Sequence, residues 1–230
     1  MKKGDLRKQE ILNTSETLFC RKGYEQTSIQ DILDTLNISK GSFYHHFISK
    51  ESLLEGICRM RAEQIYRTVS SSVNDTHSAS RNLNLLLSGM IPLMNEKLLF
   101  ILMLLPIFSL PEGRMVRMSY CDSLAGLFSP DVSKWLNKGH DSEELYCPDP
   151  EISAGLILTL VNRLWVMICD IIISAEESGK EPDLSALFQL TERYRLAIEQ
   201  IISLPFGSVE LIDLPSLRQL CEQIRNHWHQ

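Results

Sequence analysis

Residues 24–54 read YEQTSIQDILDTLNISKGSFYHHFISKESLL, and this stretch decides the fold. Thr27 and Gln30 have the spacing of a capping box, in which a hydroxyl accepts from a free N–H at a helix start. An apolar helical face follows at spacings of three and four, formed by Ile29, Ile32, Leu33 and Leu36. Asn37 then marks a turn, because asparagine tolerates the left-handed conformation. The pattern predicts a short helix closed by a tight turn.

A second short helix is expected after Ser39, whose hydroxyl can cap it. Its polar side is predicted to carry Lys40, Gly41, Ser42, Tyr44 and His45, and its apolar side Phe43 and Phe47. Ser49 is expected to cap a third helix, with Glu51 in the first turn, where the helix dipole favours an acid. Two short helices joined by a tight turn, the second rich in donors, indicate a helix-turn-helix that presents one helix to the DNA major groove.

An upstream helix completes the motif. Its apolar stripe consists of Ile11, Leu12, Ser15, Leu18 and Phe19, and it is expected to end at Lys22-Gly23. A pair of short helices is too small to bury a core alone, so a third helix must pack across it.

These residues resemble the TetR family of bacterial regulators from about Leu6 to Leu54, most specifically in TSIQDI and SKGSFYHHFISKESLL. The chain departs from the family in having Leu36-Asn37-Ile38 where Ala-Gly-Val is usual, and Phe43 where leucine is usual. The resemblance implies an all-α protein. A three-helix DNA-binding domain is expected in residues 1–50, and a larger helical ligand-binding and dimerisation domain with an extra C-terminal helix in residues 51–230.

A DNA-contact set follows from the resemblance and from side-chain chemistry. Lys40 can donate to guanine O6 and N7 or to a phosphate, and Gly41 lets the helix backbone approach DNA closely. Tyr44 and Lys50 are expected at phosphates, as in the family. The plainer alternatives are a half-buried aromatic at position 44 and a solvated lysine at position 40. The full set is Thr27, Ser28, Ser39, Lys40, Gly41, Ser42, Tyr44, His45 and Lys50.

Charge is distributed unevenly along the chain. Residues 1–60 hold nine Lys/Arg and eight Asp/Glu, whereas residues 61–230 hold fourteen and twenty-one, within a net charge of −6. A basic arm formed by Lys2, Lys3, Arg7 and Lys8 can add phosphate contacts. Because the predicted DNA-binding part is nearly neutral, weak non-specific binding and reliance on two copies are expected.

Composition favours a cytoplasmic protein. No apolar segment of a signal peptide follows Met1-Lys2-Lys3. The longest uncharged apolar run, Leu98–Phe108, is too short to span a bilayer and predicts a buried helix. The six cysteines form no CxxC pair and are expected to be reduced, and neither a cofactor nor a metal site is expected.

The remainder of the chain predicts helices. A helix is expected from Lys50 past Arg67, and residues 129–150 are expected to be rich in loops. Residues 151–177 are apolar on nearly every side, and residues 183–204 carry a coiled-coil-like seam. Two such helices pairing with those of a second copy would form a four-helix homodimer interface, as in the family. The alternative is that both helices pack only within one subunit.

An effector site is expected among apolar helices, with Phe100, Met103, Met118, Asn162, Arg163 and Trp165 as lining residues. Methionine suits adaptable pockets, although methionine and aromatic residues at helical spacing are more often plain core. Arg163 and Asp170 can hold a polar ligand group or form an ion pair between subunits. The lining favours a mostly apolar small molecule.

The sequence therefore predicts a regulator that binds a near-palindromic DNA operator as a homodimer and responds to a small effector, most simply as a repressor. An enzyme is disfavoured, because the sequence shows no GxSxG, HExxH or glycine-rich phosphate loop. The alternative is a helical adaptor or co-regulator that acts through a protein partner without an inducer.

Overall fold

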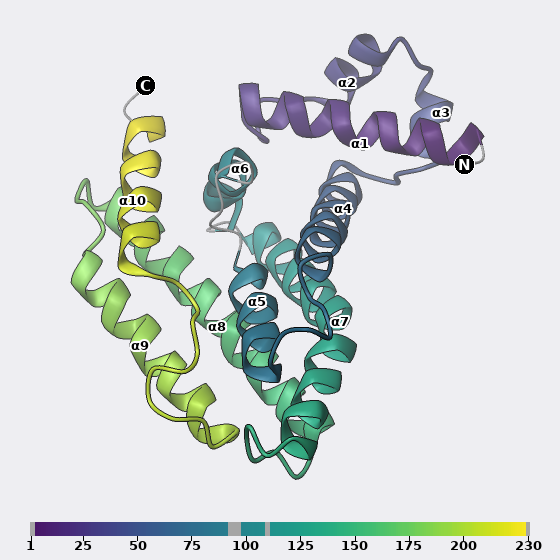
Figure 1. Cartoon of the computed structure of the whole chain (residues 1–230). Coiled ribbons are helices and arrows are strands. Elements are labelled where there is room, and N and C mark those ends of the chain that lie inside the picture. The colour runs from purple at the N-terminus through teal and green to yellow at the C-terminus, as the bar shows by residue number, and fades with distance from the viewer. Residues whose placement is uncertain (1–2, 92–97, 109–110, 229–230) are drawn as a thin grey trace. The chain divides into compact units, whose positions relative to one another are not determined.

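Helices account for the regular structure of the protein (Figure 1). A computed structural model describes residues 3–91, 98–108 and 111–228, and within these ranges it contains ten helices and no strand. In chain order they are α1 (Lys3–Lys22), α2 (Ile29–Leu36), α3 (Lys40–Tyr44), α4 (Lys50–Ser70), α5 (Ala79–Met90), α6 (Leu98–Phe108), α7 (Pro111–Asp141), α8 (Pro150–Glu177), α9 (Leu184–Ile201) and α10 (Leu214–Trp228). The all-α prediction is confirmed.

Local capping signals fix the ends of the first helices. Gly23 follows α1 with φ +85°, and Asn37 closes α2 in the left-handed conformation with φ 49°. Ser39 accepts from the backbone N–H of Ser42 at 3.2 Å and so caps α3. Ser49 accepts from the N–H of Ser52 at 3.1 Å at the start of α4. These predicted boundaries are confirmed, because each depends on residues only a few positions apart.

The predicted cap of α2 is wrong by one residue. Ser28, not Thr27, is the N-cap, and it shares a capping box with Asp31 rather than Gln30. Thr27 is fully buried, and its hydroxyl donates to the carbonyl oxygen of Gly23 at 2.8 Å. Both Thr27-Gln30 and Ser28-Asp31 satisfy the sequence pattern. The burial of Thr27, whose hydroxyl also lies 3.4 Å from the carbonyl oxygen of Leu18 in α1, selects the second.

Contacts divide the chain into two compact units. Unit 1 comprises Met1–Arg61 and Glu96–Tyr120, and unit 2 comprises Ala62–Asn95 and Cys121–Gln230. Helix α4 contributes to both without a break. The domain boundary expected after residue 50 stays a prediction, because a division by contacts does not test which segment folds independently.

The core of unit 1 holds the motif helices together. Its fully buried side chains come from α1, α2, α3 and α4, and include Ile11, Phe19, Ile32, Phe43, Leu53, Leu54 and Ile57. Helix α1 is in contact with α2 and with α6. Helix α6 is a buried helix, as predicted, with Phe100, Leu104 and Leu105 at most 2% exposed. The helix that supports the motif thus also touches an apolar helix distant in sequence.

In unit 2, helix α8 packs on α9, and α10 packs on α9 as well. The inner side of α8 is buried through Ile157, Leu164 and Ile168. Its outer side carries apolar residues in solvent, with Ile152 63% and Leu156 52% exposed. By length and composition α8 alone among the described helices could cross a membrane, yet 44% of its most apolar window is buried within the protein. A core helix of a soluble protein meets the same criterion.

The loop-rich stretch predicted over residues 129–150 is wrong in its first half, because α7 continues to Asp141 through Pro130. Proline normally ends a helix by removing one N–H and crowding the preceding turn. Here Val132, Trp135 and Leu136 are buried on the next turn, and Tyr66 of α4 donates to Asp131 at 2.9 Å. Tertiary packing in unit 2 outweighs the local signal.

A buried ion cluster joins α9 to the segment that follows it. The Nη1 group of Arg195 donates to both carboxylate oxygens of Glu199 at 2.7 and 2.9 Å. Glu199 Oε1 also accepts from the backbone N–H groups of Gly207 and Val209, both at 3.0 Å. Glu199 is 1% exposed, so its carboxylate depends on these donors for compensation.

We expect Glu199→Ala to lower the free energy of unfolding by about 3 kcal/mol, because it leaves the Nη1 group of the buried Arg195 and the buried N–H of Val209 without their acceptor. Urea unfolding monitored by circular dichroism measures the change. The matched control is Glu192→Ala, since Glu192 also bonds Arg195 but has a partly exposed side chain. The control should cost about 1 kcal/mol. If both variants lost the same free energy of unfolding, Glu199 would not be the principal acceptor of the buried cluster.

Candidate functional site

Helix α3 presents a polar face whose residues the fold does not use. Lys40, Gly41, Tyr44 and His45 are exposed, and Ser42 is half-buried. Phe43, on the opposite side, is fully buried and lies 6.0 Å from the ring of Phe47 between centroids. The predicted division of the helix into a polar and an apolar face is confirmed. One buried aromatic anchors the helix, and the polar side chains are left for a partner.

Gly41 has no structural role in the described protein. A Cβ added there would meet only the Oγ of Ser39 at 3.9 Å, and the backbone does not have a positive φ. Glycine inside a helix is less favourable than alanine by up to about 1 kcal/mol. The fold therefore has no reason for glycine at this position, whereas a partner that approaches the helix backbone closely does.

The start of α2 is less open to an anion than predicted. The backbone N–H and the hydroxyl of Ser28 both donate to Asp31 Oδ2, at 2.8 and 2.6 Å. Lys22 bonds the other oxygen of this carboxylate at 3.1 Å, and these bonds hold the pKa of Asp31 far below its usual range. Because Asp31 already accepts from the N–H and the hydroxyl of Ser28, and Thr27 is buried, both residues are less available to a phosphate than expected, and their DNA contacts stay a prediction.

The side chain of Lys50 packs against an aromatic ring. Its ammonium lies 4.1 Å from the ring centroid of Tyr24, and its burial lowers its pKa. Cation–π contact of this kind holds a charge in place without using its hydrogen-bond donors. Lys50 therefore stays a predicted phosphate contact, as a positioned charge.

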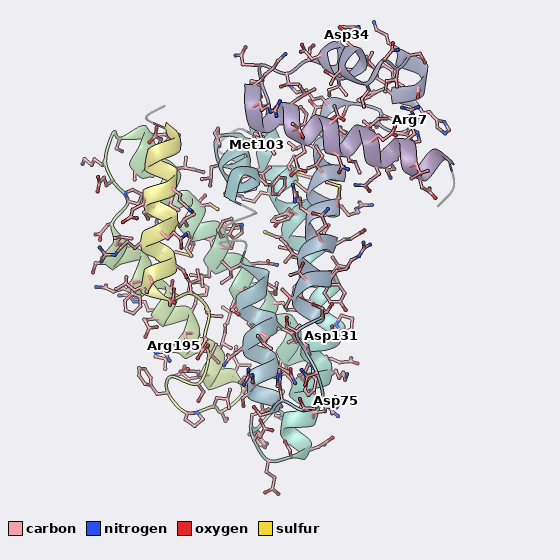
Figure 2. All side chains as sticks on the ribbon, turned by 45° about the horizontal axis from the view of Figure 1, so that its top comes forward. Arg7, Asp34, Asp75, Met103, Asp131 and Arg195 are labelled. Carbon is pink, nitrogen blue, oxygen red and sulfur yellow. The ribbon has the colours of Figure 1, made fainter. Side chains whose placement is uncertain are left out.

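Two histidines follow α3, the first of them as its C-cap. The rings of His45 and His46 meet edge to face with centroids 4.9 Å apart. The pKa of His46 is lowered by partial burial and by the positive charges of His45, Lys8 and Arg7. Arg7 lies on α1, as Figure 2 shows. Basic groups from α1 thus act on the same surface as α3, which fits the predicted contribution of the N-terminal arm.

The predicted effector residues are divided between the two units. Phe100, Met103 and Met118 belong to unit 1, where the first two are buried and Met118 is exposed. Asn162, Arg163 and Trp165 belong to unit 2. The set therefore spans both units, and as a whole it stays a prediction.

Two of the unit 2 residues have informative surroundings. Asn162 donates to the carbonyl oxygen of Cys121 at 3.1 Å, which anchors α8 to α7. The indole N–H of Trp165 is buried and has no acceptor among the described residues. Arg163 instead lines an exposed hollow of about 520 Å³ with Asp170 and Lys180, so it faces outward rather than into the core.

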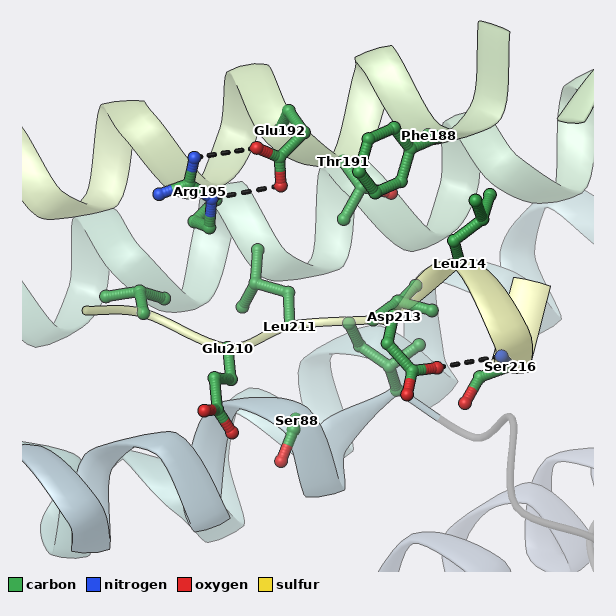
Figure 3. A pocket seen from close by; sticks show the side chains of 13 residues that line it. Ser88, Phe188, Thr191, Glu192, Arg195, Glu210, Leu211, Asp213, Leu214 and Ser216 are labelled. Atoms are coloured by element: carbon green, nitrogen blue, oxygen red, sulfur yellow. Dashed lines mark hydrogen bonds and ion pairs between the residues drawn. The ribbon is translucent and has the colours of Figure 1, made fainter. Parts of the chain in front are cut away.

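A larger hollow of about 620 Å³ lies between α9 and the segment before α10 (Figure 3). Thr191, Glu192 and Leu211 are among its lining residues. Its acidic groups have partners: Glu192 bonds Arg195, and Asp213 accepts from the N–H of Ser216 at 2.7 Å. These contacts account for the polar lining as part of the fold.

The described residues can be compared with the requirements of a metal site and of a reactive thiol. No group of three or more His, Cys, Asp or Glu side chains that could hold a metal ion occurs within the part of the chain that is described. The six cysteines all lie in the described residues and none is in a disulfide, and burial raises the pKa of Cys20 to about 11. A thiol with so high a pKa is a poor nucleophile.

Sequence reasoning missed one cluster, in which Arg61 of α4 bonds Glu16 of α1 and stands over the ring of Phe100 in α6. No local pattern could have found it, because its members are 39 or more positions apart in the sequence.

Comparison with known proteins supplies the family context. Residues 11–57 match the model described as bacterial regulatory proteins, tetR family. The HTH-type transcriptional repressor KstR2 of Rhodococcus jostii (strain RHA1) is 37% identical over 75 residues, which cover 31% of this chain and 37% of the repressor. The transposon Tn10 TetC protein of Escherichia coli is 29% identical over 143 residues, which cover 60% of this chain and 71% of that protein.

Similarity extends further in structure than in sequence. GusR of Salmonella enterica superposes with a TM-score of 0.54 at 17% identity, covering 88% of this chain and 98% of that chain. At such low identity the likeness shows the fold alone. The sequence match to the KstR2 repressor spans little more than a third of its length.

Proposed function

We propose that this chain, which belongs to the TetR family of bacterial transcriptional regulators, binds a near-palindromic DNA operator as a homodimer, represses transcription there, and is released by a small, mostly apolar effector. The activity rests on the exposed face of α3, and Gly41 is the observation that carries it. The fold has no need of a glycine at that position, and the backbone of a recognition helix in the major groove does.

Gly41→Ala tests this directly. We expect the free energy of unfolding to stay equal or to rise by up to about 1 kcal/mol, because alanine is the better helix former and its Cβ has room. DNA affinity should fall at least about tenfold, since the methyl group holds the helix off the base edges. The duplex is first obtained by in vitro selection, and binding is measured by fluorescence anisotropy.

A matched control for this substitution is Gly126→Ala on α7, an exposed helical glycine where an added Cβ also meets nothing within 4 Å. It should leave DNA affinity within about twofold. If Gly41→Ala bound the selected duplex as tightly as the unchanged protein, the close approach at α3 would be excluded.

The dimer proposal rests on the outer faces of α8 and α9. Ile152, Leu156 and Leu196 are large apolar side chains exposed on these two helices. Pairing with a second copy would bury them in a four-helix interface around a twofold axis. The same axis would set two copies of α3 on one face of DNA, so the operator should be a near-palindrome.

The effector proposal rests on the apolar helices. Phe100 and Met103 are buried on α6, and the indole N–H of Trp165 is buried without an acceptor in the described part of unit 2. An unpaired buried donor is costly and is satisfied when a ligand supplies an acceptor. Native mass spectrometry of the purified protein would report the dimer mass and any retained small molecule together.

Repression is proposed by analogy with the relatives. KstR2 is described as a transcriptional repressor, and IcaR of Staphylococcus aureus, 46% identical over 48 residues, as a negative regulator. A cytoplasmic location follows from the proposed access to DNA. The competing proposal is a helical adaptor that acts through a protein partner. It would enrich no duplex in selection and would retain a stable protein partner instead.

DNA affinity should depend on pH through His46. Its pKa lies below the ordinary 6.5 because burial and nearby cations disfavour its charged form. In the free protein, His46 therefore does not lower the stability of the fold above pH 6.5, where it is neutral. Stability declines as the pH falls through the lowered pKa of His46. DNA phosphates would offset the repulsion between His46 and the nearby cations and so raise the pKa of His46. A proton is then taken up on binding, and DNA affinity should rise as the pH falls from about 7.5 to about 6. His46→Gln should remove this increment, and an unchanged pH dependence in the variant would exclude His46 as its source.

A further inference from the structure

Arg61 joins three helices of unit 1 that are far apart in sequence. Its Nε donates to Glu16 Oε1 of α1 at 2.5 Å. The Glu16 side chain is 8% exposed and that of Arg61 29% exposed, so the pair lies largely out of water. A carboxylate so placed depends on its cation, and arginine keeps its charge at any physiological pH. The pair therefore ties α4 firmly to α1.

The same guanidinium meets an aromatic ring on α6. Its central carbon lies 5.7 Å from the centroid of Phe100, which is 2% exposed. On another side, Phe100 meets Tyr120 edge to face at 6.1 Å between centroids. Helices α1 and α6 are also in direct contact. The ring thus contacts both Arg61 and Tyr120, and its displacement would change the surroundings of the guanidinium.

Arg61 joins α1, which supports the DNA-binding motif, to α6, which carries residues of the predicted effector site. Helix α1 packs on α2 of the DNA-binding motif, whereas α6 carries Phe100 and Met103 of the predicted effector set. Figure 2 shows Met103 on α6. Both ends fall within unit 1, so the path between them is short and every contact in it is defined.

We propose that Arg61 is a positioning residue that couples α6 to the DNA-binding helices, through Phe100 on one side and Glu16 on the other. This inference rests on the proposed function. When Phe100 moves, the guanidinium no longer meets its ring, and the Glu16–Arg61 pair shifts α1 beneath the motif. Coupling is reciprocal, so DNA bound at α3 must act back on α6. That reverse effect can be measured without knowing the effector.

The experiment measures hydrogen–deuterium exchange in peptides that cover residues 98–108, with and without a duplex obtained by in vitro selection. In the unchanged protein, bound duplex should slow exchange in α6 at least threefold. In the double variant Glu16→Gln, Arg61→Met, which leaves no unpaired buried charge, duplex should still bind but the change in α6 should disappear. Arg61→Lys keeps the ion pair but lacks the planar group that covers the ring, and should show less than half of the effect.

Arg67→Met serves as the matched control, because Arg67 lies on the same helix in an exposed pair with Glu63. It should retain the full effect. Binding of duplex to the unchanged protein without any change in α6, or a full change in both Arg61 variants, would overturn the coupling while leaving the proposed DNA binding intact. If selection yields no duplex that binds, the proposed function fails and the coupling fails with it.

Discussion

Replacing Lys40 and Tyr44 together with alanine should reduce operator affinity at least about 1,000-fold while the protein stays folded and dimeric. Each side chain is expected to contact DNA in both half-sites, so the double substitution removes four contacts from one complex. At about 1 kcal/mol for each, the least expected for such contacts, the loss is about 4 kcal/mol.

The fold should tolerate this change because neither side chain belongs to the core. Lys40 is exposed and Tyr44 is 49% exposed, whereas Phe43 between Ser42 and Tyr44 carries the buried contacts of α3. Circular dichroism and sedimentation should therefore match those of the unchanged protein. Because protein groups that neutralise phosphates release counterions, the slope of log affinity against log salt concentration should also become shallower, by about one for each phosphate that the variant no longer neutralises.

A suitable control pairs one exposed cation with one exposed tyrosine outside α3. Arg81 at the start of α5 and Tyr146 between α7 and α8 are both exposed. Their double alanine variant should bind the duplex within about twofold of the unchanged protein. If the Lys40 and Tyr44 variant showed no greater loss than this control, the face of α3 would not be the DNA-binding surface.

Ile152→Glu together with Leu156→Glu should convert the dimer to a monomer. The two residues lie one turn apart on the outer side of α8, 63% and 52% exposed in a single chain. Burial of each is expected to contribute about 1.5 kcal/mol or more, and twofold symmetry doubles the number of sites. The loss of about 6 kcal/mol corresponds to at least about a 10,000-fold rise in the dimer dissociation constant. Four buried carboxylates would weaken the interface further.

Sedimentation velocity at micromolar concentration measures the outcome, and affinity for the full operator should fall with the loss of the dimer. Met115→Glu is the control, because Met115 is equally exposed, at 63%, but lies on α7 in unit 1. It should leave the protein dimeric. A dimer that survives both glutamates would place the subunit interface on another surface.

Much of the DNA-binding motif could be predicted because its signals are local. The left-handed residue Asn37, the cap Ser39 and the buried Phe43 each follow from residues within four positions. The shift of the α2 cap from Thr27 to Ser28 could not be predicted. Two overlapping capping patterns compete there, and the burial of Thr27 against Leu18 of α1 decides between them.

The effector set shows where prediction from the sequence reached its limit. Apolar residues at helical spacing identify α6 and α8 as buried helices, but not which of their faces meet. Met118 is exposed and Arg163 lines an outward hollow, whereas Phe100 and Trp165 are buried. Hydrophobic periodicity indicates that one face of a helix is buried, but it does not indicate which other element buries that face.

Local sequence patterns were sufficient to predict that this protein is helical, where α3 begins, and which residues α3 exposes. Helix caps and helix faces depend on residues up to four positions apart, and such spacings are visible in the amino-acid sequence. Only the tertiary structure decided that α7 runs through Pro130, that Glu199 holds the segment after α9, and that Arg61 stands between Glu16 and Phe100. The last pairing spans 45 residues on one side and 39 on the other. At such separations only the packing of the folded chain decides which side chains meet. A buried charge or ring contacts the residues that the neighbouring helices place beside it.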